Sequence, residues 1–402
     1  MSSHHPATHP SKGRINSTLR RFLDNEASSG ILLMAVALLA LIAANSPFSD
    51  VYFSALHSYL GPLSLQHWIN DALMAMFFLM VGLEIKRELL DGQLSSWTRR
   101  LLPGAAAAGG MLVPALIYIA FNHSDPRTVS GWAVPSATDI AFALGVMSLL
   151  GPRVPASLKV FLAALAIIDD LGAVAIIALF YTSGLSIPDL AGAGAVMAVL
   201  FVLNKRGINA LAPYLVLGAL LWLLVYRSGI HATIAGVLLA LTIPIKLTPG
   251  MPEASPGVSP LHRLEHALHV PVAFVIVPIF GLANAGVSFA GVTPAILVEP
   301  LSLGVAAGLV AGKLIGVFGA VAIMVRTGMA NLPAAANWGQ VFGVALLCGV
   351  GFTMSLFIGL LAFEDSSLQD RVKFGILAGS LVAGISGYLV LRVTSARKSC
   401  PA

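Results

Sequence analysis

The sequence predicts an all-α polytopic membrane protein, with twelve transmembrane helices, inverted repeats and two discontinuous helices that cross at mid-membrane. Composition gives the class, because 57% of the 402 residues are hydrophobic and only 10% are charged, whereas soluble domains carry about 25% charged residues. Apolar segments long enough to cross a bilayer recur along the chain. Two of them, one in each half of the chain, carry helix-breaking residues near their middle, which is typical of inverted-repeat transporters.

Twelve apolar segments can be placed to within a few residues. They cover residues 29–46, 68–90, 101–121, 130–150, 156–182, 187–204, 210–226, 229–245, 262–289, 301–325, 337–362 and 372–394. An even count puts both termini on one side of the membrane. We therefore expect one transmembrane domain, 29–394, between short tails at 1–28 and 395–402. Its repeats would be segments three to five, about 101–182, and ten to twelve, about 301–394.

The basic residues predict the orientation. If the N-terminus is cytoplasmic, eighteen lysines and arginines lie at cytoplasmic ends and four at the opposite ends, with Lys313 alone inside a span. The positive-inside rule therefore places both termini in the cytoplasm. The same rule accounts for the net charge of +5, so we expect no nucleic-acid partner. The first thirty residues lack the apolar core of a cleavable signal peptide.

Segment two ends in a charged stripe. Glu84, Arg87 and Glu88 follow one another at i, i+3 and i+4, so they share one face of a helix at its cytoplasmic end.

Segment four carries the first interruption. Pro135, Ser136, Ala137, Thr138 and Asp139 lie about a third of the way across it. Proline removes a backbone donor, and the spacing from Ser136 to Asp139 resembles a capping box that would start a new helix. We expect the helix to break at 137–139, where irregular backbone is tolerated only inside protein or around water.

Segment five contains two adjacent acids, Asp169 and Asp170, near the middle of the apolar run 160–181. A carboxylate at this depth costs roughly 2.5–3.5 kcal/mol on insertion scales. Neighbouring helical residues point about 100° apart, so the two acids cannot both face one partner. At least one should face a hydrated cavity or a cation; the alternative is a packed polar pair satisfied by neighbouring helices.

Segment nine begins with a stripe of titratable side chains, which are His262, Glu265, His266 and His269. Histidines and carboxylates within reach of one another titrate near neutral pH, so this stripe and the one on segment two predict a pH sensor. The alternative is an ordinary charged cap at the membrane interface.

Segment ten contains glycines at four-residue spacing, namely Gly304, Gly308, Gly312 and Gly316. They predict a smooth ridge that lets another helix approach closely. Lys313 lies beside this ridge. A buried lysine either loses its proton or pairs with an acid, for which Asp169 is the preferred partner if the repeats meet at the centre. The alternative is a lysine that snorkels to the interface, against which its position near mid-span counts.

Segment eleven carries the second interruption, at Gly349 and Gly351 near its midpoint. Glycine alone is weak support for a break, but its pairing with the break in segment four matches an inverted repeat. We expect Asp139 to compensate the positive half-helix N-termini at the crossing and Lys313 the negative C-terminal ends.

These residues predict one site, formed by Asp139, Asp169, Asp170, Thr138 and Lys313. Na+ and Li+ prefer oxygen ligands, which carboxylates, a hydroxyl and unwound carbonyls supply. Carboxylates also bind protons, and one site cannot comfortably hold both, which is the physical basis of exchange. No cofactor is expected.

Three other functions are compatible with parts of the sequence. A Na+-coupled symporter would need a pocket for an organic solute, which the sequence does not indicate. His262 to His266 spells H-x-x-E-H, the pattern of some zinc peptidases, but an apolar run follows in place of a third ligand. An intramembrane aspartyl protease could use paired acids to activate water, yet neither acid lies in a Gly-x-Gly-Asp setting.

Eight stretches closely resemble the NhaA family of bacterial Na+/H+ antiporters. They are 68–90, 131–146, 165–173, 228–237, 263–269, 280–289, 311–316 and 348–358, including LAIIDDLGA, RLEHALH and CGVGFTMSLFI. The resemblance implies twelve helices with crossed, broken helices four and eleven. It also implies electrogenic exchange of more protons than Na+ or Li+ across a bacterial inner membrane.

The resemblance also implies residue roles. Asp169 and Asp170 match the pair that binds Na+ and protons, with Lys313 as the partner of Asp169, and Thr138 and Asp139 match the unwound stretch of helix four. Residues that match the pH-response region are Glu84, Arg87, Glu88, Glu265, His266 and, separately, His231. Asp71 matches a supporting acid of segment two.

Two features depart from the family pattern. The best-known member has a lysine where this chain has His262, so its pH profile does not carry over. The connection at 46–67 is shorter than that member's dimerising β-hairpin, so a homodimer built by that device is left open.

Overall fold

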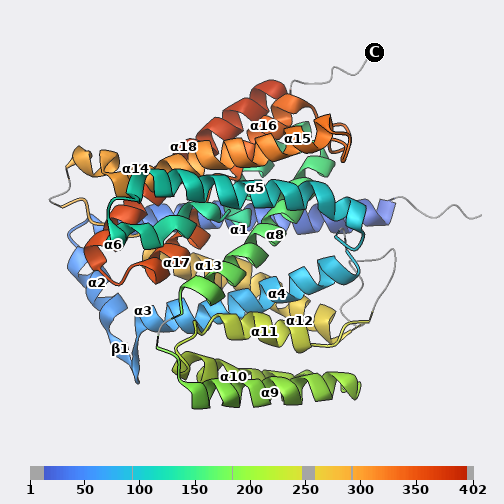
Figure 1. Ribbon diagram of the computed structural model, residues 1–402, viewed down its shortest axis with the longest axis vertical. Helices are drawn as coiled ribbons and strands as arrows, with labels where there is room; N and C mark the ends of the chain where they lie inside the picture. Colours follow the sequence, from blue (N-terminus) through green and yellow to red (C-terminus); the bar gives the residue numbers. More distant parts are fainter. Residues whose placement is uncertain (1–12, 93, 183, 247–258, 291–292, 396–402) are drawn as a thin grey trace, which may run out of the picture.

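The computed structural model describes residues 13–92, 94–182, 184–246, 259–290 and 293–395 (Figure 1). Most of the expected tails, residues 1–12 and 396–402, lie outside these ranges. The first helix begins at Gly13, so residues 13–28, expected as part of a tail, continue the first apolar segment as a helix.

Helices make up 79% of the residues that the structure describes. The α-helices are α1 (Gly13–Ala44), α2 (Ser49–His57), α3 (Leu65–His67), α4 (Met74–Leu90), α5 (Trp97–Asn122), α6 (Pro126–Val129), α7 (Ile140–Ser148), α8 (Ala156–Phe180), α9 (Ile187–Lys205), α10 (Leu211–Arg227), α11 (Ile234–Thr242), α12 (Pro260–Pro271), α13 (Val277–Asn284), α14 (Pro300–Ala307), α15 (Gly319–Arg326), α16 (Trp338–Leu347), α17 (Phe352–Ala362) and α18 (Ser366–Thr394). The π turns are η1 (Trp68–Leu73), η4 (Val272–Ile276), η6 (Gly308–Gly312) and η7 (Leu314–Phe318). The 3-10 turns are η2 (Ser130–Ser136), η3 (Gly151–Arg153) and η5 (Pro294–Val298).

Two short strands, β1 (Tyr59–Leu60) and β2 (Leu63–Ser64), form an antiparallel hairpin in which Tyr59 is opposite Ser64. Gly61 makes the turn with φ +69°, a conformation that glycine adopts without a steric penalty. A hairpin is therefore present in the connection 46–67, but each of its strands is only two residues long.

The described helices define a multi-pass membrane protein. Seven are long and apolar enough to cross a membrane: Leu65–Leu90, Trp97–Asn122, Ala156–Phe180, Ile187–Lys205, Pro260–Asn284, Pro300–Arg326 and Ser366–Thr394. Three further pairs of helices qualify if each bent pair is one span, which raises the number to ten. The remaining two apolar segments hold the shorter helices α10 and α11, so each of the twelve predicted segments contains helix.

The bundle has two parts that meet at α8 and α4. In Figure 1, α5, α14, α16 and α18 lie at the top, α9 and α10 lie at the bottom, and α4, α11 and α12 lie above α9 and α10. One buried cluster joins α8, α15, α16 and α18 through Leu162, Val321, Val344 and Leu391. Another joins α4, α9, α10, α11 and α12 through Leu83, Leu200, Leu221, Leu239 and Leu261. A third buried cluster spans both parts, since it includes Phe78 of α4, Val174 of α8 and Ile376 of α18. The contact between α8 and α4 therefore lies within this shared apolar core.

The glycine ridge lies against α5, as predicted. A Cβ atom on Gly312 would come within 2.6 Å of Pro114 Cα, and one on Gly304 within 2.5 Å of Asn122 Nδ2. Gly316 and Gly109 face each other so closely that a Cβ on either would meet the other's carbonyl oxygen. The prediction that this ridge allows close helix approach is therefore confirmed, and it brings Lys313 into the centre of the bundle.

Two helix pairs are interrupted at the predicted positions in the sequence. η2 ends at Ser136 and α7 begins at Ile140 with a bend of 45°, while α16 ends at Leu347 and α17 begins at Phe352 with a bend of 41°. The two interruptions lie directly against each other, because the Asp139 N–H donates to the Val350 carbonyl at 2.7 Å.

The predicted capping box is wrong. The Ser136 hydroxyl donates to the Met111 carbonyl at 3.1 Å, so it does not cap α7. Ala137 is extended, with φ −90° and ψ 151°, which delays the start of the helix. Asp139 is the N-cap instead, and its side chain accepts from the Phe142 N–H at 2.9 Å.

Candidate functional site

Lys313 and Asp169 form a buried ion pair. The Lys313 Nζ lies 2.8 Å from Asp169 Oδ2, and both side chains are 0% exposed. The same Nζ donates to the carbonyl of Ser136, the last residue of η2. Carbonyls at the end of a helix carry partial negative charge, so the lysine compensates this helix end, as expected from the sequence. Lys313 itself lies between the π turns η6 and η7, and such turns occur frequently at functional sites.

Asp170 faces a different direction from Asp169. It is 4% exposed, and its Oδ1 atom has no hydrogen-bond partner among the described residues. Ile167 and Val174, one turn before and one turn after it on α8, both lie against side chains of α4. Since residues three and four apart share a helix face, Asp170 lies on the α4 side of α8. Glu84 of α4 is close enough to Asp170 to interact electrostatically with it.

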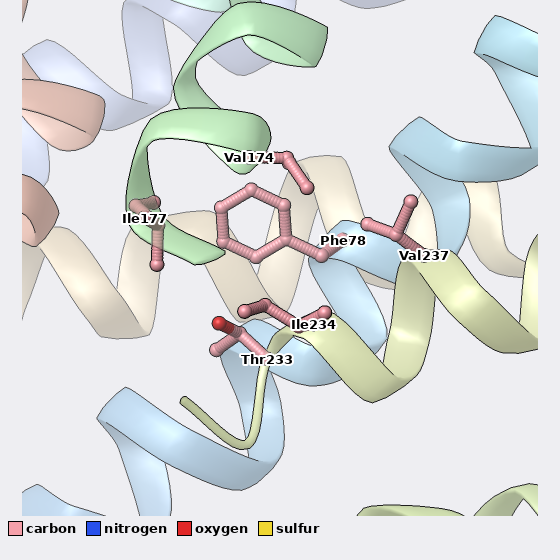
Figure 2. A pocket seen from close by; sticks show the side chains of 6 residues that line it. All are labelled: Phe78, Val174, Ile177, Thr233, Ile234 and Val237. Atoms are coloured by element: carbon pink, nitrogen blue, oxygen red, sulfur yellow. The ribbon is translucent and has the colours of Figure 1, made fainter. Parts of the chain in front are cut away.

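An apolar pocket lies beyond Asp170 along the same face of α8. Figure 2 shows Phe78 of α4 between Val174 and Ile177 of α8 and the start of α11. Its lining residues are Phe78, Val174, Ile177, Thr233, Ile234 and Val237. Only the Thr233 hydroxyl is polar, so the pocket offers no ligand set for an organic solute.

Asp139 caps two helices at once. Its Oδ1 accepts from Phe142 N at the start of α7, and its Oδ2 accepts from Thr353 N at 3.0 Å and Thr353 Oγ1 at 2.5 Å at the start of α17. The carboxylate therefore compensates both positive helix ends, as expected. Both oxygens are already occupied by these bonds, so the geometry assigns Asp139 to the helix crossing more directly than to the ion pair.

Thr138 links the crossing to the buried acids. Its hydroxyl donates to the Cys348 carbonyl at 2.9 Å, and it also lies beside the Asp169 carboxyl. The crossing contains two polar residues that the sequence reasoning missed, Thr353 and Ser355, whose hydroxyl donates to the Val134 carbonyl at 2.7 Å. Only their position in the sequence could have identified these two residues, because both follow the predicted break at Gly351 within four residues.

The glycines of the second interruption are required by packing. A Cβ on Gly349 would meet the Leu309 carbonyl, and one on Gly351 would lie 3.1 Å from the Ala137 carbonyl. Pro135 packs against Gly308, where a Cβ would lie 2.7 Å from the proline Cβ. These contacts hold η6, the first interruption and the second interruption together.

The charged stripes of segments two and nine meet. Arg87 Nε lies 2.9 Å from Glu265 Oε1, and Arg87 Nη1 lies 2.9 Å from Glu88 Oε1. Glu84 interacts electrostatically with all three of these side chains. The structure thus brings together four of the predicted pH-response residues at one end of α4 and α12.

The three histidines of segment nine lie on α12, but they differ in burial. His262 is buried and its Nδ1 is 2.7 Å from Ser259 Oγ, while His266 is exposed next to His269. His231 lies in another part of the protein, with its ring 5.7 Å from that of Phe357 in α17. In the described ranges, no three His, Cys, Asp or Glu side chains are grouped to hold a metal ion. The described residues of the H-x-x-E-H motif therefore do not form a metal-binding group, and Glu265 pairs with Arg87 instead.

Asp71 lies in η1, two turns before Phe78, where its carbonyl accepts from Trp222 Nε1 at 3.4 Å. Its neighbour Asn70 forms a reciprocal amide pair with Asn284 of α13, with Asn284 Nδ2 donating to Asn70 Oδ1 at 2.8 Å. Asp71 therefore belongs to the contact of α4 with its neighbouring helices and lies apart from the Lys313–Asp169 pair.

The fold and the site define a helical membrane protein in which buried charges lie at interrupted helices, the arrangement by which secondary transporters bind ions. The family model described as Na+/H+ antiporter 1 matches residues 20–391, and the chain belongs to this family.

Relatives named Na+/H+ antiporter NhaA match nearly the whole chain. The protein from Rhizobium etli is 68% identical over 387 residues, which cover 96% of this chain and 98% of that protein. The protein from Mesorhizobium japonicum is 65% identical over 386 residues, which cover 96% and 97%. Among solved structures, the sodium proton antiporter MjNhaP1 from Methanocaldococcus jannaschii at pH 8 matches with a TM-score of 0.53. At 14% identity, with 95% of this chain and 99% of that chain covered, it supports the fold alone.

Proposed function

We propose that the protein is an electrogenic, pH-regulated Na+(Li+)/H+ antiporter that expels sodium in exchange for protons by alternating access. One observation carries the proposal: the carboxylate of Asp170 is buried with an unpartnered oxygen, next to Asp169, which is paired with Lys313. The names and the high identity of the relatives agree with this function.

Exchange follows from competition at one pair of acids. Na+ or Li+ takes oxygen ligands, and Asp170, Asp169 and Thr138 supply them beside the unwound carbonyls. When the carboxylates take up protons, their oxygens lose the charge that holds the cation. A cation arriving from the cytoplasm therefore displaces protons, and the reverse occurs on the other side. More protons than Na+ or Li+ ions move per cycle, which makes exchange electrogenic.

We further propose twelve transmembrane helices, with α5 to α8 and α14 to α18 as the inverted repeats. The bends at residues 137–139 and 348–351 then make segments four and eleven discontinuous helices that cross at mid-membrane. The positive-inside count puts both termini in the cytoplasm, and a bacterial inner membrane fits the relatives. The single transmembrane domain spans 29–394, and a second copy of the chain is a candidate partner.

The cluster of Glu84, Arg87, Glu88 and Glu265 is the proposed pH-response region, with His266 at its edge. It lies at the cytoplasmic end of α4 in this orientation, and Glu84 connects it electrostatically to Asp170. His231 would act on pH dependence separately, through its contact with α17. Asp71 has a supporting role.

The proposal is tested by proton movement in everted membrane vesicles. Na+, Li+ or K+ is added across a pH series to vesicles with the native protein, Asp170→Asn, or Asp189→Asn. The last is a matched control, since Asp189 is partly buried and pairs with the exposed Arg227 away from the Lys313–Asp169 pair. We expect Na+ and Li+, but not K+, to collapse the proton gradient, and only Asp170→Asn to abolish this response. The proposal fails if Na+ has no effect at any pH or if Asp170→Asn behaves as native.

The alternatives predict different outcomes. A Na+-coupled symporter would move Na+ only together with an organic solute, so solute-free vesicles would show no response. A zinc peptidase would lose all activity with Glu265→Gln, and a chelator would inhibit it, whereas an antiporter should show at most a shifted pH response.

A further inference from the structure

One face of α8 is apolar except at Asp170. Ala164, Ile167, Asp170, Val174 and Ile177 follow at intervals of three and four residues, so they form one stripe. This stripe lies against α4 on both sides of Asp170. An ion that reaches Asp170 along this interface must therefore pass apolar packing, whichever end it comes from.

The packing on one side of Asp170 is the pocket of Figure 2, lined by Phe78, Val174, Ile177 and the start of α11. The packing on the other side is a separate buried cluster, which we call the inner seal. It consists of Val81 and Ile85 of α4, Ala164 and Ile167 of α8, and Leu94. The direction of α4 and α8 places the inner seal at the cytoplasmic end in the orientation proposed above.

Leu94 differs from the other members of the inner seal because it belongs to no helix. It lies in the connection between α4 and α5, yet it is only 1% exposed. The other four residues are fixed by helical hydrogen bonds along their own backbones. A loop residue can leave such a cluster without breaking a helix, which is the usual property of lids.

The connection is held at both ends. After α4, the Gly92 N–H donates to the Arg87 carbonyl at 3.1 Å, next to the Arg87–Glu88 ion pair. Before α5, the Arg100 guanidinium donates to the Leu94 carbonyl and, at 2.8 Å, to the Leu89 carbonyl. Arg100 therefore joins the last turn of α4 to the backbone of Leu94 itself.

We propose that Leu94 is a lid over the cytoplasmic access route to Asp170, and that Arg100 is the positioning residue that holds it closed. The inference rests on the proposed antiporter function for its sidedness. Its location follows from the inner seal, because Leu94 belongs to the same buried cluster as Ile167, the residue one turn before Asp170. The connection that carries Leu94 begins next to the ion pair of Arg87 and Glu88. A change in this charged cluster can therefore alter the position of the lid and, with it, the access of ions to Asp170.

Accessibility of a cysteine beneath the lid tests the proposal. The parent carries Cys400→Ser and Ile167→Cys, and Cys348 remains because it is buried. A membrane-impermeant, positively charged thiol reagent is added to everted vesicles, and the labelling rate of Cys400→Ser alone is subtracted. Leu94→Ser, Leu94→Met and Arg100→Gln are introduced into this parent. Leu150→Ser, at another buried leucine in a turn outside the seal, is the matched control.

We expect Leu94→Ser and Arg100→Gln to label about tenfold faster or more, the size of effect that loss of one buried leucine's transfer free energy has on a closing equilibrium. Leu94→Met and Leu150→Ser should label at the parent rate. With the reagent at the opposite face, in right-side-out vesicles, none of the variants should change. Arg100→Gln leaves Leu94 intact, so it keeps the test valid if Leu94→Ser does not fold.

The lid proposal is wrong if all variants are labelled at the same rate. It is also wrong if Leu150→Ser accelerates labelling as much as Leu94→Ser does, because that result would indicate a general loosening of the protein. Acceleration at the opposite face overturns the sidedness. Labelling requires no Na+ flux, so these results are independent of the Asp170→Asn experiment. If that experiment supports exchange and labelling is unchanged, the lid alone is wrong.

Discussion

Lys313 and Asp169 come from different halves of the chain, and they form an ion pair in which neither side chain has exposed surface. Their separation of 2.8 Å between Nζ and Oδ2 is typical of a charge-assisted hydrogen bond. The pair joins α8 to the helix that carries the glycine ridge, so it connects the two proposed repeats through a buried charge pair.

Removing one member of this pair should destabilise the protein strongly. We expect Lys313→Ala to lower the free energy of unfolding by about 3–5 kcal/mol, because it leaves a buried carboxylate without its partner. Adding Asp169→Asn to Lys313→Ala should recover part of this loss, since the uncompensated charge is gone. Thermal unfolding of the purified proteins in detergent measures both effects. A single variant as stable as native would contradict the role of the pair.

The helix crossing should depend on the Thr353 hydroxyl. Thr353→Val removes the 2.5 Å bond to Asp139 while nearly preserving volume, so we expect a loss of about 1–3 kcal/mol. Thr353→Ser keeps the donor and should lie close to native. The same unfolding assay compares the three proteins, and equal stability of the valine and serine variants would show that the bond contributes nothing.

The glycine ridge allows a matched pair of substitutions. Gly316→Ala would press a methyl group onto the Gly109 carbonyl, and overpacking of this kind costs about 1–3 kcal/mol. Gly319→Ala, one turn further on, meets no atom within 4 Å and should be neutral or slightly stabilising. If the two variants unfold at the same temperature, α5 and the ridge are not in the contact described.

Ala335 has φ +60° in the connection between α15 and α16, a conformation that costs a residue with a Cβ about 1–2 kcal/mol. Ala335→Gly should therefore raise the melting temperature, even though glycine loses more chain entropy on folding. Ala334→Gly, its neighbour, lacks this relief and should be neutral or destabilising. A lower melting temperature for Ala335→Gly would refute the strain.

The ion pair of Arg87 with Glu265 should influence pH dependence more than maximal rate. We expect Glu265→Gln to shift the pH profile of Na+-dependent proton movement while a substantial maximal rate remains. Asp125→Asn, at an exposed pair with Arg127, is the control and should leave the profile in place. Complete loss of exchange at every pH would instead place Glu265 in the ion site.

The sequence predicted the membrane class, the two interruptions and the glycine ridge because each depends on local patterns, namely apolar length, proline, glycine and four-residue spacing. It also paired Lys313 with Asp169, because a buried cation needs an anion. It could not assign the N-cap of α7 correctly, since the choice between Ser136 and Asp139 depends on the carbonyl of Met111 and on Thr353, more than 200 positions away from Asp139 in the chain. The inner seal could not be predicted from the sequence either, because no local pattern distinguishes Leu94 from any other leucine in a connection between helices.

The two interruptions also determine where an applied voltage acts. Polar backbone and charged side chains lie together at residues 136–139 and 348–353 inside the bundle, with apolar packing on both sides of Asp170. A membrane potential falls mainly across regions of low dielectric, so the two apolar layers carry most of it. A unit charge crossing the full potential gains or loses about 2.3 kcal/mol per 100 mV. In the proposed exchange, each charge that binds at Asp170 would cross one of the layers, so cell voltage itself would bias which side of the membrane the site fills from.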